Sequence, residues 1–212
     1  MQYILRGNYD AALRQLNGAK TSGASPAEVE NLRGLALLLR GDLKQALQSF
    51  DRALSLDPAL EAARFNRGLA WLRSADNAKA VADLQQIYAN DQSPLRGDAA
   101  YHLGIALDRL GRAKEAEAAL DRALTLDAKL DGALLYVGML RERRGDLQGA
   151  GRAYRDYLNA HPQSTAAMLR FGMSAHKAGR TEVAKSYLEK VIATAPQSAD
   201  AVEARKFLVM WE

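Results

Sequence analysis

Three histidines are the side chains of this sequence best suited to metal binding or to proton transfer near neutral pH. His102, His161 and His176 fall in different parts of the chain, and none has a second ligand or a pair of carboxylates at metal-ligand spacing. Cysteine is absent, so thiolate ligands and disulfide bonds are excluded within these 212 residues. We therefore expect no metal site, and we interpret His161, which precedes Pro162, as a turn residue.

One glycine-rich stretch could suggest a nucleotide site. Residues 145–151 read GDLQGAG, but the lysine of a phosphate-binding loop is missing. The serines and the acidic residues show no spacing typical of a catalytic triad or of a paired acid and base. The sequence therefore predicts a protein with no cofactor and no catalytic residue, which is not an enzyme.

Composition narrows the class of protein further. Apolar residues make up 48% and charged residues 25% of the chain, which is typical of a folded globular protein. The 29 basic residues are interspersed with 25 acidic ones, so the net charge of +4 does not indicate a nucleic-acid-binding face. No apolar run is long enough to span a membrane.

A repeated pair of small residues organises the chain. The first member of the pair is Gly34, Gly68, Gly104, Gly138 or Gly172. The second member is Gly7, Gly41, Ala75, Gly111, Gly145 or Gly179. A later alanine follows at Ala12, Ala46, Ala80, Ala116, Ala150 and Ala184, and prolines close three units at Pro58, Pro162 and Pro196. Because the second member recurs after 34, 34, 36, 34 and 34 residues, the sequence predicts an array of helical repeats.

Each part of the repeat has a physical task. The first glycine lies inside a first helix (helix A), where glycine is tolerated if a neighbouring helix must come close. The second small residue supplies the left-handed conformation that ends helix A. A polar residue then caps the second helix (helix B), as Asn8, Asp42, Asp76 and Asp146 are placed to do. The alanine of helix B shares one face with a bulky residue four positions later, namely Phe50, Leu84, Leu120, Tyr154 or Leu188.

This pattern resembles the tetratricopeptide repeat, a helix–turn–helix unit of about 34 residues. The resemblance covers essentially the whole chain and implies an all-α fold, a right-handed superhelical α-solenoid with one partial repeat, five full repeats and a C-terminal capping helix. The tryptophan usual near the start of helix A is replaced by Glu30, Arg64, Ala100, Leu134 and Met168. This departure is common in the family and does not change the predicted fold.

The register divides one solenoid domain into seven segments. They are residues 1–26 (a truncated first repeat), 27–60, 61–96, 97–130, 131–164 and 165–198 (five full repeats) and 199–212 (the capping helix). Met1–Arg6 corresponds to only the end of a helix A, so we expect the natural protein to continue upstream. Gln92–Asp98 predicts an extended loop in the third repeat. Gly149 and Gly151 are interpreted as close packing, with a flexible point as the alternative.

An apolar stripe along the A helices is the candidate binding surface. It combines the residue after the first glycine with the residue four positions before it and, in early repeats, the residue three positions after it. The stripe comprises Asn31, Leu35, Leu38, Phe65, Leu69, Leu72, Tyr101, Ile105, Leu135, Met139, Leu169 and Met173. Offsets of four and three keep these residues on one helical face. A row beside them, called the basic rim, comprises Arg73, Arg109, Arg143 and Lys177.

Two interpretations of the stripe stay open. It can pack each helix A against the next one, or it can line a groove for an amphipathic helix or an extended apolar segment of a protein partner. The resemblance favours the groove, because this face is concave in tetratricopeptide arrays. Some members of the family clamp the terminal carboxylate of a heat-shock protein with polar groove residues. Asn31, Asn66 and Arg170 are not arranged as that clamp, which disfavours such a partner.

The layout also resembles the pilotin lipoproteins of type IV pili, six-repeat arrays that help an outer-membrane secretin to localise and assemble. Those proteins have an extended connection after the third repeat, as at Gln92–Asp98 here. Gly149–Leu158 and Met168–Gly179 look similar to their fifth and sixth repeats. The resemblance implies a secretin subunit as partner and a location at the periplasmic face of the outer membrane. It also implies a lipidated cysteine, which would have to lie upstream of Met1.

Two other functions fit the same repeats. The chain could be a general scaffold or adaptor, cytoplasmic or periplasmic, in regulation or exopolysaccharide export. It could also be the regulatory arm of an enzyme whose catalytic part lies outside this sequence. A lipidation motif upstream of Met1 would favour the pilotin, and a long fused domain would favour the regulatory arm. The sequence does not define the oligomeric state.

Overall fold

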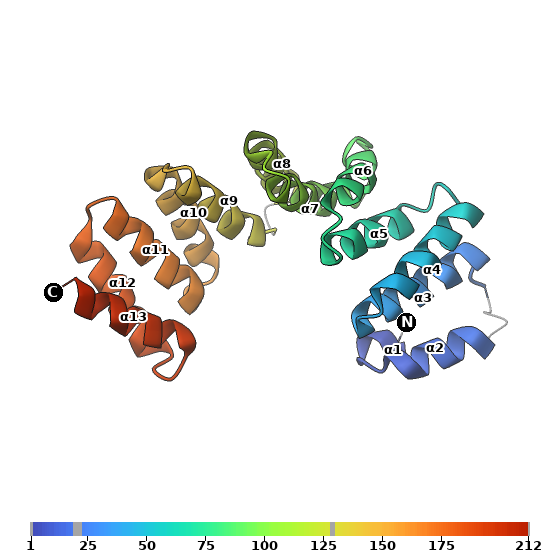
Figure 1. Ribbon diagram of the computed structural model, residues 1–212, viewed down its shortest axis with the longest axis horizontal. Coiled ribbons are helices and arrows are strands. Elements are labelled where there is room, and N and C mark those ends of the chain that lie inside the picture. The colour runs from blue at the N-terminus through green and yellow to red at the C-terminus, as the bar shows by residue number, and fades with distance from the viewer. Residues whose placement is uncertain (1, 19–22, 128–129, 212) are drawn as a thin grey trace. The chain divides into compact units, whose positions relative to one another are not determined.

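The computed structural model describes residues 2–18, 23–127 and 130–211, and every regular element in these ranges is an α-helix (Figure 1). This confirms the predicted all-α repeat fold. The chain forms two compact units, Met1–Leu126 (unit 1) and Asp127–Glu212 (unit 2).

In unit 1, A and B helices alternate along the chain. The helices are α1 (Gln2–Leu5), α2 (Tyr9–Gly18), α3 (Pro26–Arg40), α4 (Leu43–Leu56), α5 (Glu61–Arg73), α6 (Asn77–Tyr88), α7 (Arg96–Arg109) and α8 (Ala113–Leu126). Each helix packs against the next one in sequence, and α3 and α5 also contact one another. The A helices α3, α5 and α7 therefore follow one another inside this unit.

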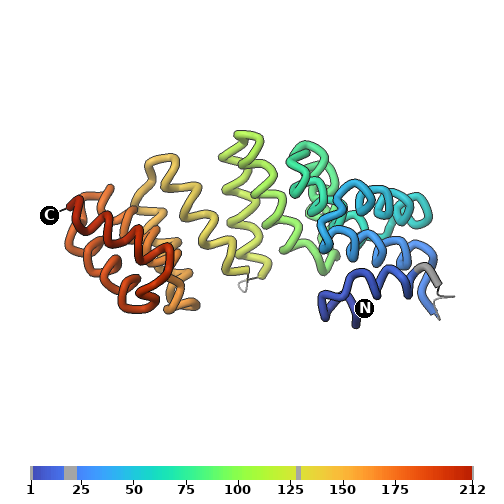
Figure 2. Tube along the Cα trace, turned by 60° about the horizontal axis from the view of Figure 1, so that its bottom comes forward, coloured from blue at the N-terminus to red at the C-terminus, as the bar shows by residue number. Residues whose placement is uncertain are grey.

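Unit 2 continues the alternation and adds one helix. Its helices are α9 (Gly132–Arg143), α10 (Leu147–Ala160), α11 (Thr165–Lys177), α12 (Thr181–Thr194) and α13 (Ala199–Met210). The last three lie side by side at the red end of the chain in Figure 2, and α13 packs against both α11 and α12. The last helix thus covers the end of the array, as a capping helix must.

The first glycine of each repeat allows helix B of the same repeat to come close. A Cβ atom at Gly34 would lie 2.5 Å from the ring of Phe50, which is a severe overlap. At Gly138 the same overlap occurs with the ring of Tyr154. The predicted close approach is confirmed. The bulky side chain of helix B occupies the space that a Cβ atom would need, so helix A must carry glycine at this position.

The turn between the A and B helices also follows the prediction, with one exception among the caps. Gly41 and Gly111 have positive φ angles of 100° and 76°, and Ala75 is left-handed with a φ of 60°. Asp76 and Asp146 accept hydrogen bonds from the backbone of the following helix. Asp42 makes no such bond, and its carboxylate pairs with Arg40.

The extended loop of the third repeat is shorter than predicted. Helix α7 already begins at Arg96, so the last residues of Gln92–Asp98 are helical. The loop is held to α5 by Glu61, which accepts hydrogen bonds from Asn90 at 2.7 Å and from Ser93 at 2.6 Å. These contacts explain how an insertion is accommodated without separating α5 from α7.

Gly149 and Gly151 differ in their surroundings. A Cβ atom at Gly149 would collide with the carboxylate of Asp146, which caps α10. At Gly151 a Cβ atom would lie 3.6 Å or more from its neighbours, an ordinary contact distance. Close packing therefore accounts for Gly149 but not for Gly151.

Candidate partner-binding surface

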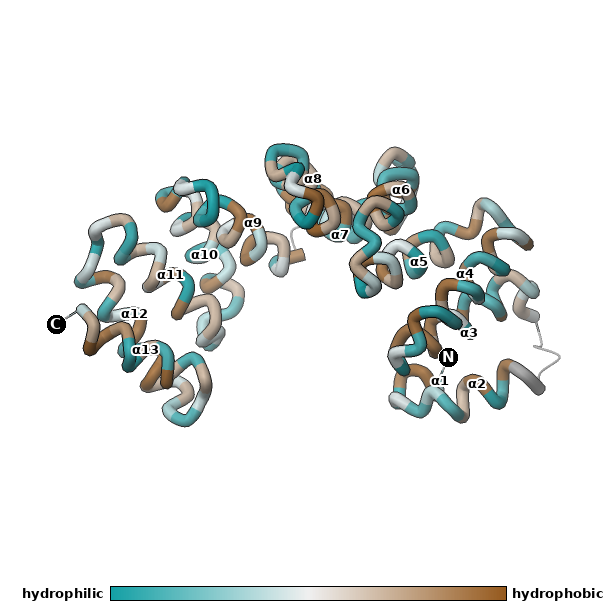
Figure 3. Tube along the Cα trace, viewed as in Figure 1, coloured by the Kyte–Doolittle hydropathy of each residue, from teal (hydrophilic) through white to brown (hydrophobic). Residues whose placement is uncertain are grey.

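In unit 1 the stripe is half-buried rather than fully open. Leu35, Phe65 and Ile105 are partly exposed on α3, α5 and α7, as are Asn31, Leu69 and Tyr101. Leu38 and Leu72 are only 2% and 7% exposed and belong to the core. Figure 3 colours the chain by hydropathy and shows hydrophobic and hydrophilic residues interspersed along its helices. The partly exposed members form the accessible surface of the stripe here.

In unit 2 the same pattern recurs on α9 and α11. Leu135, Met139 and Met173 are partly exposed and pack at the edge of the core that contains Tyr154. Leu169 is 6% exposed and is part of that core. Methionine is an adaptable side chain, so Met139 and Met173 can adjust to an irregular partner.

Burial divides the stripe into two sets of residues. Leu38, Leu72 and Leu169 do the packing, because they are buried between helices, and they were wrongly assigned to an open groove. The remaining members keep part of their surface exposed. Their role in binding a partner stays a prediction.

Polar and aromatic contacts join neighbouring A helices within the unit 1 stripe. The amide of Asn66 donates a hydrogen bond of 2.9 Å to Asn31, which links α5 to α3. His102 on α7 lies between Phe65 and Tyr101, with ring centroids 5.7 Å and 4.9 Å away. Burial lowers the pKa of His102 to about 4, so the ring is neutral at pH 7 and serves as an aromatic contact.

The basic rim is tied to the chain itself. Arg73 donates to the carbonyl oxygen of Leu38 at 2.9 Å, and Arg109 donates to that of Leu72 at 2.8 Å. Each arginine thereby satisfies a carbonyl in the last turn of the preceding helix A, where a cation is favourable. Arg143 also has an interaction within the chain. Arg73 and Arg109 thus join successive repeats, which the sequence prediction did not include.

Lys177 of the rim belongs to a network in unit 2. Its ammonium group donates to Glu142 at 2.6 Å, and the hydroxyl group of Tyr154 donates to the other oxygen of Glu142 at 2.9 Å. Burial, followed by the charge of Glu142, raises the pKa of Tyr154 well above its usual value. The network therefore holds α9, α10 and α11 together with a protonated tyrosine.

The other two histidines also have structural contacts. His161 contacts the carboxylate of Asp131 and the ring of Tyr157. His176 stacks on Trp211 with ring centroids 3.8 Å apart, which fixes the end of the chain to α11. Within the described ranges, no three His, Cys, Asp or Glu residues gather as metal ligands, and no helix could cross a membrane.

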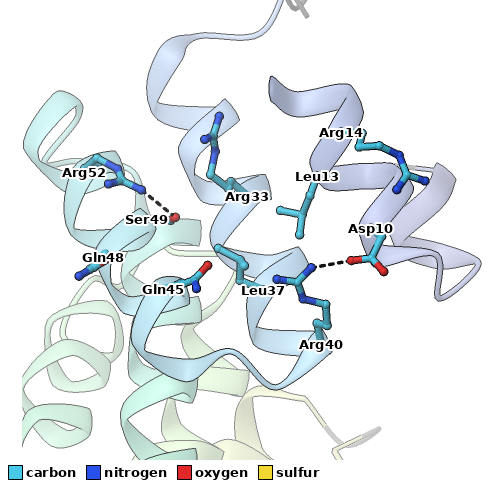
Figure 4. Close-up of a pocket in the computed structure, with 10 residues that line it drawn as sticks. All are labelled: Asp10, Leu13, Arg14, Arg33, Leu37, Arg40, Gln45, Gln48, Ser49 and Arg52. Carbon is cyan, nitrogen blue, oxygen red and sulfur yellow. Dashed lines mark hydrogen bonds and ion pairs between the residues drawn. The ribbon is translucent and has the colours of Figure 1, made fainter. Parts of the chain in front are cut away.

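A polar cavity between α2, α3 and α4 was missed by the sequence prediction. It has a volume of about 580 Å³, and Figure 4 shows the side chains around it. Four arginines line it: Arg14, Arg33, Arg40 and Arg52. The sequence did contain an indication of this cavity. The residue before the first glycine is arginine in the second and third repeats, whereas it is apolar in the last three.

Comparison with family models supports the repeat assignment. Models described as TPR repeat and tetratricopeptide repeat match residues 34–74, 65–131, 132–164 and 166–198. Proteins built from such repeats are generally scaffolds for protein interactions. Together the matches run from residue 34, inside the first full repeat, to residue 198 at the end of the last one.

Solved structures share the same fold. PilW, a widely conserved type IV pilus biogenesis factor, is 21% identical with a TM-score of 0.87 over 98% of this chain and 94% of its own. PilF of Pseudomonas aeruginosa is 18% identical with a TM-score of 0.83 over 99% and 93%. YrrB, a TPR protein with an unusual peptide-binding site, is 23% identical with a TM-score of 0.70 over 92% and 100%. At these identities the likeness shows the fold alone.

Proposed function

We propose that this chain, which belongs to the tetratricopeptide repeat family, is a non-catalytic scaffold. It binds a segment of a protein partner along its A helices. The more specific proposal is an assembly factor of the bacterial envelope in type IV pilus biogenesis. In this role the chain acts like a pilotin and binds a secretin subunit. A lipid anchor upstream of Met1 and a location at the periplasmic face of the outer membrane belong to the same proposal.

The observation that carries the binding proposal is the partly exposed apolar stripe. Leu35, Leu69 and Ile105 recur at one position of α3, α5 and α7, and each keeps part of its side chain exposed. Met139 and Met173 continue the position on α9 and α11. Apolar side chains repeated along one helical face fit an amphipathic helix or an extended apolar segment. Such a segment would cover surface that is otherwise exposed to water.

The pilus proposal is supported by similarity over nearly the whole length of two pilus proteins. The TM-scores with PilW and PilF, 0.87 and 0.83, exceed the 0.70 found with YrrB. The similarity in fold extends over 98% and 99% of this chain, which supports the proposal of a pilus role. A pilus role would place the stripe against a secretin subunit.

Titration calorimetry with a purified secretin subunit tests the proposal. We expect Leu69→Asp, Ile105→Asp and Met139→Asp each to weaken binding by at least ten-fold, because each places a charge in the apolar contact. Leu56→Asp is the matched control, since Leu56 is 58% exposed at the end of helix B in the second repeat. Circular dichroism of each variant verifies folding.

Two outcomes would contradict the proposal at different levels. If the wild-type chain binds no secretin subunit, the pilotin role is wrong. If it binds and all three stripe variants bind as tightly as Leu56→Asp, the role stands but the stripe is not the contact.

A further inference from the structure

Arg33 and Arg67 occupy the same position in consecutive repeats but differ in their partners. Arg67 makes a two-pronged contact with Asp83, at 2.8 Å from Nε and 2.7 Å from Nη2. Its remaining Nη1 donates to Asp51 at 2.7 Å. All three nitrogens of this guanidinium group therefore have an acidic partner.

Arg33 has no equivalent carboxylate. The residue that corresponds to Asp83 in its repeat is Ser49, one position before the bulky residue of helix B. The Nη2 atom of Arg33 reaches the carbonyl oxygen of Leu16 only at 3.5 Å, and Nε lies 3.5 Å from Glu30. Nε is buried and has no hydrogen bond. The guanidinium group of Arg33 is thus poorly satisfied in comparison with that of Arg67.

The side chain of Arg33 lines the cavity between α2, α3 and α4 together with three other arginines (Figure 4). Arg40 pairs with Asp10 and Asp42, and Arg52 pairs with Glu30. Four guanidinium groups, including Arg14, therefore outnumber the three carboxylates that contact them. The cavity carries an excess of positive charge in a partly enclosed site.

We propose that this cavity binds the carboxylate of an acidic segment of a protein partner, with Arg33 as the principal contact. A guanidinium group presents a planar pair of donors that matches a carboxylate. The neighbouring repeat supports a carboxylate as the ligand, because the carboxylate of Asp83 fills the corresponding place beside Arg67. The amides of Gln45 and Gln48 lie at the same cavity and can donate further hydrogen bonds to a peptide backbone.

This site is separate from the apolar stripe. Arg33, Leu37 and Arg40 line the cavity, whereas Asn31 and Leu35 belong to the stripe on the same helix. A step of two residues turns an α-helix by roughly 200°. The two surfaces therefore lie on opposite sides of α3, and the carboxylate site does not depend on the proposed function of the stripe.

Fluorescence anisotropy with a labelled hexaglutamate peptide, acetylated and amidated at its ends, tests the site. We expect Arg33→Gln and Ser49→Asp each to weaken binding to the full chain by at least ten-fold. Ser49→Asp would do so by supplying an internal carboxylate to Arg33 while leaving all four arginines in place. Arg122→Gln is the matched control, because Arg122 is exposed on α8 at the position that corresponds to Arg52.

The proposal predicts that the control binds within two-fold of the wild type and that Leu69→Asp does so as well. A hexaglutamine peptide should not bind, because it has the same length but no carboxylates. Unchanged affinity of a folded Ser49→Asp variant would overturn the site. An equal loss in Arg122→Gln would show non-specific attraction, and binding of hexaglutamine as tight as that of hexaglutamate would refute the carboxylate assignment.

Discussion

The repeats fall into two groups that differ at the position before the first glycine of helix A. The second and third repeats carry arginine there, whereas the last three carry apolar side chains, in the order Arg33, Arg67, Leu103, Val137 and Phe171. In the apolar group, Leu103 and Val137 are each 1% exposed. The position therefore lies in the core of the last three repeats, whereas the second and third repeats place a charged arginine there.

Arg67 shows what such a charge requires. Its partner Asp83 is 4% exposed, at a position that Ala119 holds in the following repeat. The ion pair of Arg67 and Asp83 therefore occupies the positions that the buried Leu103 and Ala119 hold in the following repeat. The comparison teaches that the repeat fixes where a side chain lies but leaves open whether that place is filled by apolar packing or by a paired charge.

Removing one member of this ion pair is expected to have the largest effect. Asp83→Asn leaves the guanidinium group of Arg67 with only the exposed Asp51, so we expect the free energy of unfolding to fall by about 3 kcal/mol. Urea denaturation measures the change. Asp51→Asn is the control, because Asp51 is 55% exposed and its loss should cost less than about 1 kcal/mol. Equal effects of the two variants would contradict the difference in burial.

His102 is a polar side chain whose ring contacts are with Phe65 and Tyr101, which carry no charge, so it can be compared with the paired Arg67. Its pKa is lowered to about 4 by burial, below the ordinary value of 6.5, so the folded state resists protonation. The stability should be unaffected above pH 6.5 and should decrease as the pH falls from 6.5 toward 4. At pH 5 the loss should be roughly 2 kcal/mol relative to pH 7. Urea denaturation at both pH values should show a smaller loss in His102→Gln, and an identical loss would exclude His102 as its cause.

Ser49→Asp tests whether Arg33 can be converted into a copy of Arg67. The new carboxylate would pair with a guanidinium group that is only 27% exposed, so we expect stability to rise by about 1 kcal/mol. The melting temperature should increase in this variant. The same substitution in an Arg33→Leu background should give no such rise, because the acid would then keep as partner only Arg52, whose side chain is 57% exposed. A rise in both backgrounds would show that pairing with Arg33 is not the reason.

Replacing the whole ion pair should have the smallest effect. The double variant Arg67→Leu and Asp83→Ala copies the residues of the following repeat, Leu103 and Ala119. An apolar replacement of a buried ion pair is often neutral or stabilising, so we expect a change within about 1 kcal/mol of the wild type. Urea denaturation of the double variant beside Asp83→Asn provides the measurement. A loss as large as that of Asp83→Asn would mean that the third repeat cannot pack like the fourth.

Much of the fold could be predicted because the repeat spacing carries its own physical logic. Gly34 was expected to permit a close approach and does so against Phe50, and Gly111 was expected to be left-handed and is. One cap was predicted wrongly. Asp42 pairs with Arg40 and does not cap α4, and spacing alone does not reveal that choice.

The exposure of the candidate binding surface could be predicted only in part. The stripe was identified from its period, but period does not separate Leu38, which is buried, from Leu35, which is partly exposed. That distinction depends on how closely neighbouring A helices pack. The arginine cavity depends on three helices meeting, and only the unusual Arg33 pointed to it in the sequence.

The central claim is that a partner binds along the stripe of the A helices, and methyl NMR spectroscopy tests it most directly. A purified secretin subunit would be titrated into a chain with labelled leucine, isoleucine and methionine methyl groups. We predict shifts in the methyl signals of Leu69, Ile105 and Met139, while those of the exposed Leu56 and Leu110 keep their positions. Shifts confined to helix B residues such as Leu56 at saturation would contradict the claim.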